Sequence, residues 1–443
     1  MHPYIPNTPS EQEEMLKAIG IASMDALFAD IPEAVRLQRE LRLPAPLNEM
    51  ALRAHIKQLS ETNLHAENHV CFAGGGVYDH YIPAVINHLA GRQEFYTAYT
   101  PYQAEMSQGT LQAVFEYQTM MARLTGMDVS NASVYDGATA CAEAMLMACG
   151  IHGGDEVVLP DTLNPEYARV CQTYAQYRGI TLRRAAHDAQ TGCADADALA
   201  ALIGPKTACV LVQSPNYYGI IEDIAALTPI AKQHGALLIA VVDPISLALL
   251  ASPGWLGADI AVGEGQALGN PMSFGGPGFG FIACKKAYQR KLPGRIVGQT
   301  DDAQGRRGFV LTLQAREQHI RRENATSNIC SNQALCALRA AMYLAVMGDD
   351  GLRSVAAESM RNAHSLCDAL TADGRFTRRF TGPFFKEFAL NVAGDVPGLR
   401  QSMLKEGYFA GIELPGSGLL LAATEKQTNA QIQAFAQKAV TLL

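Results

Sequence analysis

The middle of the chain alternates between short apolar runs and helical stretches. Turn residues bound four apolar runs: DEVVLP (155–160), TACVLVQ (207–213), ALLIAVVD (236–243) and ADIAVGE (258–264). Helical stretches such as PEYARVCQTYAQYRG and DIAALTPIAKQHG separate these runs. Continuous apolar strands that alternate with helices predict a mostly parallel sheet covered by helices on both faces.

Helical patterns precede this region. Ser10 and Glu13 predict a capping box that opens a first short helix, which Gly20 closes. Further helical stretches lie around 23–29 and 48–60. From residue 107, a longer helical pattern places four apolar residues on one face: Val114, Tyr117, Met121 and Leu124.

After about residue 310 the alternation gives way to helices followed by short strands. We therefore predict an N-terminal helical segment (1–66), a large α/β domain (67–310) and a smaller C-terminal α+β domain (311–443). The elements expected in the last domain are helices at 332–347 and 351–370, strands at 375–380, 386–392 and 418–424, and a terminal helix.

Composition and charge narrow the possible functions. The 443 residues are 48% hydrophobic and 18% charged, as in an ordinary globular protein. A net charge of −8 argues against a general nucleic-acid or anionic-membrane surface. The chain has no secretory pattern and no apolar run near the ~20 residues of a spanning helix, so we expect a soluble, cytoplasmic protein. The ten cysteines include no C-x-x-C pair, so we expect small buried side chains rather than disulfides or a metal site.

Residues 131–150, NASVYDGATACAEAMLMACG, predict a strand end, a turn at Asp136-Gly137 and a helix that opens with Thr139. A helix N-terminus beyond the carboxyl end of a strand is a natural phosphate site, because its N–H groups are free. Asp136 would repel a phosphate dianion, and a turn that binds nothing is the alternative.

Asp243 ends the apolar run 236–243. A carboxylate there is where the pyridine nitrogen of a pyridoxal cofactor would find its partner. The alternative is an aspartate that caps a turn before Pro244.

The stretch 261–286, AVGEGQALGNPMSFGGPGFGFIACKK, predicts a strand, a glycine-rich turn and a second strand. In pyridoxal phosphate enzymes such a turn presents the lysine that holds the cofactor as a Schiff base, but Gln266 stands there. The nearest lysines, Lys232, Lys285 and Lys286, are not placed to project into a cleft. Without a suitably placed lysine, the residues alone therefore argue against a pyridoxal phosphate enzyme.

The run AYTPYQAEMSQGTLQAVFEYQTMMARLTGMDVSNASVYDGATACAEAM (98–145) resembles the glycine decarboxylase (P protein) family of the glycine cleavage system. The similarity is to the N-terminal half, which in many bacteria and archaea is a separate subunit. It continues through FAGGGVYDHYIPAVINHLAGRQEFYTAYTPYQ, GEGQALGNPMSFGGPGFGF and REQHIRRENATSNICSNQAL, and so covers essentially the whole chain.

The resemblance implies the aspartate-aminotransferase-like fold (pyridoxal fold type I) in a copy that lacks the covalent anchor. It puts Gln266 opposite the Schiff-base lysine and Gly265 opposite a histidine. It also puts Asp243 opposite the carboxylate that pairs with the pyridine nitrogen, and Asp136 and Thr139 in the phosphate turn. No covalent cofactor is expected on this chain, and pyridoxal phosphate would lie on the partner, subunit 2.

The resemblance further implies an active site at the interface of the two kinds of half. There glycine loses carbon dioxide, and the aminomethyl group passes to the lipoyl arm of the H protein. We expect a heterotetramer of two copies of each subunit, inactive as this chain alone. A catalytically silent structural or regulatory partner of subunit 2 is one alternative, and an autonomous pyridoxal enzyme with an unseen lysine is another.

The best candidate for completing the partner's site is the loop 99–105, in which Tyr99, Tyr102 and Glu105 offer hydrogen-bonding groups. Packing of these tyrosines in the interface is the alternative. The glycine-rich stretch 74–81 is a second candidate, because glycines allow a close approach to a partner backbone. For His80 in this stretch, the alternative is a surface histidine with no role in the site. The basic run 316–322 could attract the H protein or form a solvated helix face.

Overall fold

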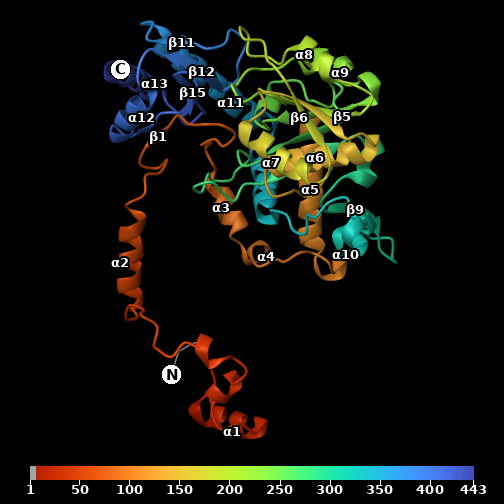
Figure 1. Cartoon of the computed structure of the whole chain (residues 1–443), viewed down its shortest axis with the longest axis vertical. Helices are drawn as coiled ribbons and strands as arrows, with labels where there is room; N and C mark the ends of the chain where they lie inside the picture. Colours follow the sequence, from red (N-terminus) through yellow and green to blue (C-terminus); the bar gives the residue numbers. More distant parts are fainter. Residues whose placement is uncertain (1–5) are drawn as a thin grey trace. The chain divides into compact units, whose positions relative to one another are not determined.

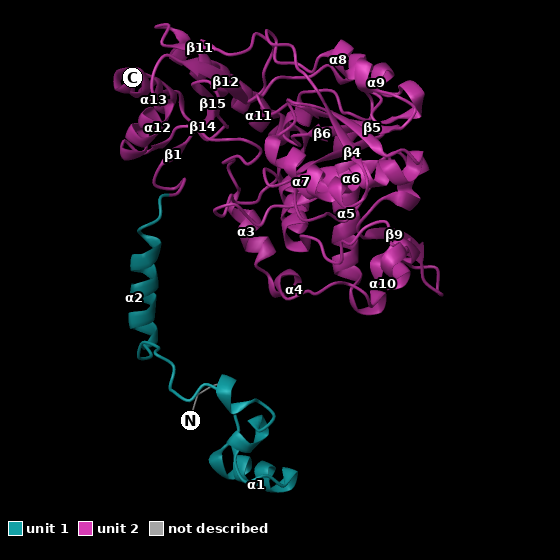
Figure 2. Ribbon diagram, viewed as in Figure 1, with its two compact units in different colours: residues 1–64 teal, residues 65–443 magenta. Residues whose placement is uncertain are grey.

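In the computed structural model, which describes residues 6–443, the chain divides after Leu64 into two units (Figure 2). The first unit contains the helices α1 (Pro9–Ile19) and α2 (Glu49–Ser60), joined by a segment with two short 3-10 helices. None of its described residues is buried. The helices predicted around residues 10–20 and 48–60 are confirmed.

The predicted capping box of α1 is wrong by two residues. Thr8 is the N-cap, its hydroxyl accepts a hydrogen bond from the N–H of Glu11, and the Glu11 carboxylate accepts one from the N–H of Thr8. Pro9 takes the first helical position, which suits its fixed φ, so Ser10 already lies inside the helix. Gly20 ends the helix in the left-handed region, at φ 84°, as predicted.

A seven-stranded sheet forms the centre of the second unit (Figure 1). Five strands are parallel, and the sequence predicted all of them except β4, whose TLRRA sequence at the sheet edge is largely exposed. β8 runs antiparallel to both of its neighbours. The strands in spatial order are β2 (Val129–Ser130), β8 (Gly280–Cys284), β7 (Ile260–Glu264), β6 (Leu237–Val242), β5 (Thr207–Ser214), β3 (Glu156–Pro160) and β4 (Thr181–Ala185).

Alternate residues along each strand enter different cores, which confirms the predicted cover on both faces. In β6, Leu238 and Ala240 pack in one core and Leu237 and Ile239 in the other. The first core also contains residues of α5 (Gln108–Thr125), α8 (Ala196–Leu202), α9 (Ile224–Ala231) and α11 (Ala334–Thr371). The second contains residues of α6 (Gly137–His152) and α7 (Pro165–Gln176).

A second, antiparallel sheet occupies the C-terminal part, as predicted. The chain reaches it through α11, which is interrupted at Gly348 (φ 57°) and so contains both predicted helices. Residues of α11 that pack with this sheet begin at Ala363, whereas those before it belong to the core of the large sheet. We therefore propose that the C-terminal domain begins within α11 rather than at residue 311. Its elements are β11 (Phe376–Arg378), β12 (Glu387–Val392), β15 (Gly418–Ala422), β14 (Ile412–Leu414), α12 (Val396–Lys405) and α13 (Asn429–Leu442).

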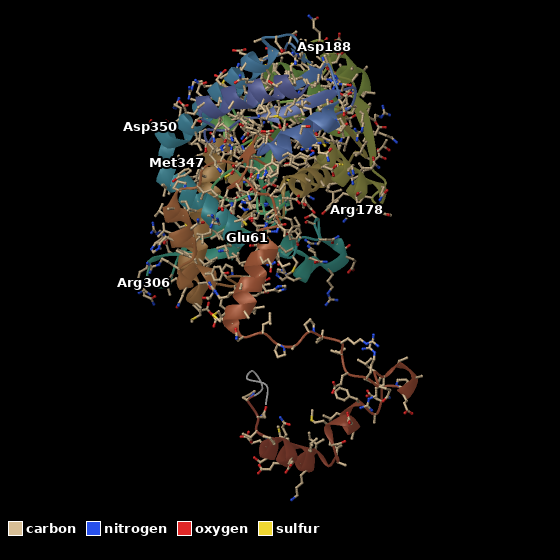
Figure 3. All side chains as sticks on the ribbon, turned by 90° about the vertical axis from the view of Figure 1, so that its left-hand side faces the viewer. Glu61, Arg178, Asp188, Arg306, Met347 and Asp350 are labelled. Carbon is tan, nitrogen blue, oxygen red and sulfur yellow. The ribbon has the colours of Figure 1, made fainter. Side chains whose placement is uncertain are left out.

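Smaller elements complete the second unit. β9 and β10 form an antiparallel hairpin that the sequence did not predict, and β1 pairs in parallel with β13. Charged side chains such as Arg178, Asp188, Arg306 and Asp350 are exposed (Figure 3). No helix within residues 6–443 combines the length and apolar character that crossing a membrane requires. The remaining bounds are β1 (Val70–Cys71), β9 (Ile296–Asp301), β10 (Arg307–Thr312), β13 (Tyr408–Phe409), α3 (Ala84–Ala90), α4 (Gln93–Tyr96) and α10 (Gln318–Arg321).

Candidate functional site

The carboxyl ends of the parallel strands gather several polar side chains. Asp243 directly follows β6, and Glu264 is the last residue of its neighbour β7. The N-terminus of α6, at Gly137, lies against Glu264. In open α/β sheets this edge is where ligands bind. The structure therefore brings Asp243 and the α6 N-terminus, both singled out from the sequence, together at this edge of the sheet.

Asp243 forms an ion pair with a lysine that the sequence analysis missed. Nζ of Lys386 lies 2.6 Å from Oδ2 of Asp243, and only 1% of the Lys386 side chain is exposed. The same Nζ lies 2.9 Å from Nε2 of His80 and 3.8 Å from the centre of the Tyr78 ring. The ammonium group is thus enclosed by an anion, an imidazole and an aromatic face.

His80 links Lys386 to Glu425 through its two ring nitrogens. An ammonium group only donates hydrogen bonds, so Nε2 of His80 accepts from Lys386, and Nδ1–H donates to Glu425 at 2.7 Å. Burial, together with the charge of Lys386, lowers the pKa of His80 and favours its neutral ring. The alternative interpretation of His80 as a surface histidine is therefore wrong, because its side chain is buried.

Glu387 forms a second polar cluster next to Lys386. Its carboxylate accepts hydrogen bonds from the Tyr78 hydroxyl at 2.8 Å and from the N–H of Gly75 at 2.6 Å. Burial raises the pKa of Glu387 to about 7, although these two donors and Lys386 lower it. The glycine-rich stretch 74–81 therefore packs on residues of its own chain around the site.

Two carboxylates of this chain accept hydrogen bonds from N–H groups in the first turn of α6. Oε2 of Glu264 accepts from the N–H of Gly137 at 2.9 Å, and Oδ1 of Asp136 accepts from the N–H of Thr139 at 2.7 Å. Helix α6 begins at Gly137, slightly earlier than predicted, with Asp136 as its N-cap. Burial raises the pKa of Glu264 to about 7, against the effect of its backbone donors. Two of the first-turn N–H groups that a phosphate would need, those of Gly137 and Thr139, are therefore already hydrogen-bonded.

The turn after β7 has no room for the residues of a pyridoxal site. Gln266 is buried, its Oε1 accepts from the N–H of Tyr78 at 3.1 Å, and its Nε2 donates to the carbonyl of Asn270 at 2.7 Å. A Cβ atom on Gly265 would lie 2.0 Å from the Phe279 ring. The Phe279 ring thus excludes a side chain at position 265, where the resemblance implies a histidine in the other half.

Pyridoxal phosphate does not fit these residues. Lys386 pairs with the carboxylate that the pyridine nitrogen would need, and Glu264 takes the N–H of Gly137. The space left beside Asp243 and Glu264 is about 40 Å³, enough for only a few water molecules. The three lysines considered from sequence lie elsewhere, since Lys232 and Lys285 form ion pairs with Asp259 and Lys286 is exposed.

The predicted loop 99–105 lies at the protein surface, and its three candidate side chains differ in their surroundings. Tyr99 is 85% exposed. The Tyr102 hydroxyl accepts a hydrogen bond from Nη2 of Arg295 at 2.9 Å, so this side chain has a partner within the chain. Glu105 is exposed on a short 3-10 helix. That these residues complete another subunit's site stays a prediction.

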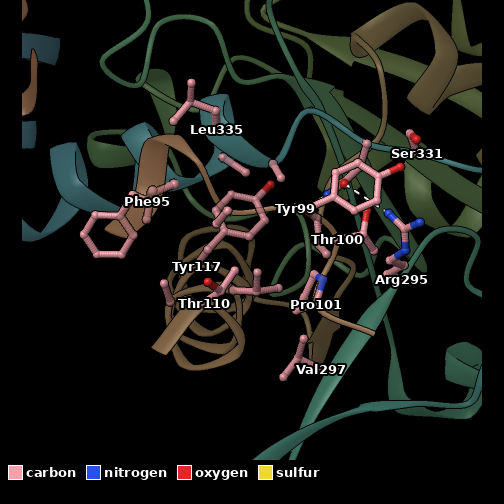
Figure 4. Close-up of a pocket in the computed structure, with 18 of the residues that line it drawn as sticks. Phe95, Tyr99, Thr100, Pro101, Thr110, Tyr117, Arg295, Val297, Ser331 and Leu335 are labelled. Atoms are coloured by element: carbon pink, nitrogen blue, oxygen red, sulfur yellow. Dashed lines mark hydrogen bonds between the residues drawn. The ribbon is translucent and has the colours of Figure 1, made fainter. Parts of the chain in front are cut away.

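A cavity of about 240 Å³ opens beside this loop (Figure 4). Tyr99, Thr100 and Pro101 form part of its wall, and the Tyr117 hydroxyl and Nε of Arg295 are buried there with no hydrogen-bond partner among residues 6–443. Most of the remaining wall is apolar and comes from α5, α11 and the segment before the loop. The loop therefore borders an open, mostly apolar cavity.

The sequence contained one signal for the missed residues. Lys386 and Glu387 interrupt an apolar run, FFKEFAL, at the start of a predicted strand. Two adjacent charges inside a buried strand indicate paired polar groups. In the basic run 316–322, Arg316 donates to the carbonyl of Gly294 at 2.6 Å and is structural, whereas Arg321 and Arg322 are exposed.

Comparison with known proteins gives consistent similarities. The sequence model of the family described as "Glycine cleavage system P-protein" matches residues 2–438. A protein of Chlorobaculum parvum named "Probable glycine dehydrogenase (decarboxylating) subunit 1" is 48% identical over 443 residues, covering 99% of this chain and 100% of the relative. A protein of Moorella thermoacetica with the same name is 50% identical over 438 residues, covering 98% of both.

Solved structures point to the same family and fold. A crystal structure of glycine decarboxylase (P-protein) of the glycine cleavage system, in inhibitor-bound form, is 44% identical with a TM-score of 0.92, covering 99% of this chain and 100% of the other. A sphingosine-1-phosphate lyase of Burkholderia pseudomallei is 16% identical with a TM-score of 0.69, covering 94% of both chains, and shows similarity of fold alone. These neighbours are enzymes of pyridoxal fold type I, so the predicted fold is confirmed.

Proposed function

The chain belongs to the glycine cleavage system P-protein family, and we propose that it acts as subunit 1 of a glycine dehydrogenase (decarboxylating). Identities of 48% and 50% with relatives of that name, over nearly the whole of both chains, support this proposal. The name implies a second subunit. We propose a cytoplasmic heterotetramer with two copies of each.

The filled pocket at the ends of β6 and β7 is the observation that supports the proposed assignment of roles to the two subunits. Lys386 pairs with Asp243, and Glu264 accepts from the N–H of Gly137, at the two positions that the resemblance assigns to the ring nitrogen and the phosphate. We therefore assign pyridoxal phosphate, and the lysine that anchors it, to subunit 2. Bound there, the cofactor supplies the electron sink for the loss of carbon dioxide from glycine.

The loop 99–105 is this chain's proposed contribution to catalysis. Exposed hydroxyl and carboxylate groups on a surface loop are suited to hydrogen-bond a small polar substrate in a neighbouring subunit. Tyr99 and Glu105 would orient glycine and help to keep water out of the partner's site, and Arg295 would hold Tyr102 in place. The aminomethyl product would pass to the lipoyl group of the H protein, for which the exposed Arg321 and Arg322 are a candidate contact.

Reconstitution tests this function directly. The purified chain, subunit 2 and H protein of one glycine cleavage system are assayed alone and together for exchange of labelled bicarbonate into the carboxyl group of glycine. We expect full exchange only when all three are present. Full exchange by subunit 2 and H protein without this chain would instead favour the silent structural or regulatory partner.

A further inference from the structure

Another cavity, of about 360 Å³, is lined by residues before, in and after α10 and by the end of a 3-10 helix (Lys286–Lys291). Four of its lining residues carry a positive charge: Arg290, Lys291, Arg316 and Arg321. Among the residues that the structure describes, no acidic one lines this cavity, although the whole chain has 43 Asp or Glu against 35 Lys or Arg. A concave surface of one charge concentrates ligands of the opposite charge.

None of the four cations forms an ion pair with a carboxylate of residues 6–443. The terminal nitrogens of Arg316 donate to the carbonyls of Leu292 and Gly294, the second at 2.6 Å, and its Nε is buried with no hydrogen-bond partner in the same part of the chain. Nε of Arg321 donates to the carbonyl of Ala315 at 3.0 Å. Burial lowers the pKa of Arg316, as expected for a cation without an ion-pair partner. These neutral acceptors therefore fix the two guanidinium groups without compensating their charge.

Elsewhere in the chain, two neighbouring lysines share a carboxylate. Nζ of Lys232 and Nζ of Lys285 lie 3.4 and 2.8 Å from Oδ1 of Asp259. At the cavity, the acidic residue nearest in sequence is Glu317, but its Oε2 lies 3.6 Å from Nδ1 of His319 and it lines a neighbouring cavity. An anion that enters the cavity would therefore supply the compensation that the chain itself provides for its other cluster.

The charge and the size of the cavity indicate a small molecule with phosphate groups. Pockets for small molecules measure roughly 300–1,000 Å³, so the cavity is of suitable size. Guanidinium groups bind phosphate oxygens through two parallel hydrogen bonds, and the Thr326 hydroxyl and the Asn324 amide are neutral donors in the same wall. One phosphate monoester carries about −1.5 to −2 at pH 7. Two phosphate groups are therefore needed to balance most of the four positive charges.

We propose that this cavity binds a small molecule containing a diphosphate, with the four cations around its two phosphate groups. Leu313 and Ala315 add apolar area to the wall, on which the organic part of such a ligand would pack. A nucleoside diphosphate therefore suits the cavity better than inorganic diphosphate. The site is separate from the loop 99–105, which borders the cavity of Figure 4, and it does not depend on the proposed function.

Calorimetry on the full-length chain, in a buffer without divalent cations, measures the Kd of ADP and of inorganic diphosphate. The variant is Arg290→Gln with Lys291→Gln, because both side chains are exposed and the melting temperature of the free chain should stay the same. The Kd of ADP should rise by roughly 10-fold or more. The increase in melting temperature that ADP causes in the unsubstituted chain should also be lost. Arg321 is left unchanged, because it is also a candidate contact of the H protein.

The matched control is Arg183→Gln with Arg184→Gln, which removes the same charge from two exposed positions of the edge strand β4. It should change the Kd of ADP less than about threefold, since these charges are screened from the cavity by salt. Equal weakening by the control would show attraction to net charge alone and would overturn the inference.

Two further outcomes decide the class of ligand. Equal Kd values for ADP and inorganic diphosphate would support the phosphate site and remove the role of Leu313 and Ala315. If neither compound binds at roughly millimolar concentration, the inference is wrong. If, in addition, the double variant binds the H protein more weakly, the cavity is a protein contact instead. Glycine–bicarbonate exchange is not used in this test, so its failure would leave the proposed function intact.

Discussion

Nζ of Lys386 lies 2.6 Å from Oδ2 of Asp243, and this buried contact joins the C-terminal sheet to the end of β6. The resemblance implies that this carboxylate lies opposite the one that pairs with a pyridine nitrogen, and in this chain its ion-pair partner is Lys386. Both groups need the pairing, because an isolated buried charge is costly. The ion pair therefore compensates both charges within this chain.

Removing the lysine should destabilise the chain strongly. Lys386→Met keeps most of the volume but leaves the Asp243 carboxylate with a single hydrogen bond within the described residues, from the N–H of Ile245. The loss of one partner from a buried pair costs about 3–5 kcal/mol of unfolding free energy. The double variant Asp243→Asn, Lys386→Met should recover most of that loss, because no unpaired charge remains. Urea unfolding of the wild type, both single variants and the double variant gives the coupling. Additive effects of the two substitutions would show that the pair does not act as a unit.

Glu387 should make stability decrease as pH rises. Burial raises its pKa to about 7 from 4.5, so between these values the folded chain holds a proton that the unfolded chain releases. The free energy of unfolding is therefore highest below pH 4.5 and falls as the pH approaches 7, by on the order of 3 kcal/mol for this one group. Glu387→Gln is shaped like the neutral acid and can still accept from Gly75 while donating to Tyr78. Its unfolding free energy should fall less than that of the wild type between pH 5 and pH 8. If the free energy of unfolding changed with pH in the same way for both proteins, Glu387 would not be the group responsible.

Gln266→Lys alone should not create a pyridoxal phosphate site. A lysine at this position would still meet Lys386 on Asp243, Glu264 and Asp136 at the α6 N-terminus, and the Phe279 ring against Gly265. We expect no visible absorption band after incubation with pyridoxal phosphate. We also expect no label on residue 266 after borohydride reduction. A reducible yellow adduct at that residue would show that the pocket opens more readily than its contacts indicate.

The fold was largely predictable because the large sheet is buried on both faces. β6 is continuously apolar and β5 is apolar over residues 208–212, and the alternation of such strands with helices leaves few topologies. Strand β4 was missed because an edge strand with two arginines lacks that pattern. In the site, Asp243 was found from its position at a strand end. Lys386 was not, because it lies 143 residues further along the chain and only the tertiary fold brings the two together.

Substitutions of Tyr99 and Glu105 in the loop 99–105 should lower catalysis without affecting assembly or stability. Tyr99 and Glu105 are exposed, so Tyr99→Phe and Glu105→Gln should leave the melting temperature of the chain unchanged. If their polar groups hydrogen-bond charged glycine in the partner's site, each substitution removes about 1.5–3 kcal/mol, a loss in kcat/KM of roughly 10- to 150-fold. Tyr102→Phe differs, because it also removes a partner of Arg295, and it should lower stability slightly as well as activity.

The measurement is glycine–bicarbonate exchange with subunit 2 and H protein, beside the Kd for subunit 2 and the cofactor content of the complex. The matched control is Tyr177→Phe, an equally exposed tyrosine at the end of α7, which should not change exchange. Cofactor content should stay the same in every variant, because the anchor is assigned to subunit 2. Unchanged exchange in all three loop variants would remove the loop from the shared site and leave the silent partner as the better explanation. Exchange that falls only in proportion to weaker subunit binding would make the loop an interface segment instead.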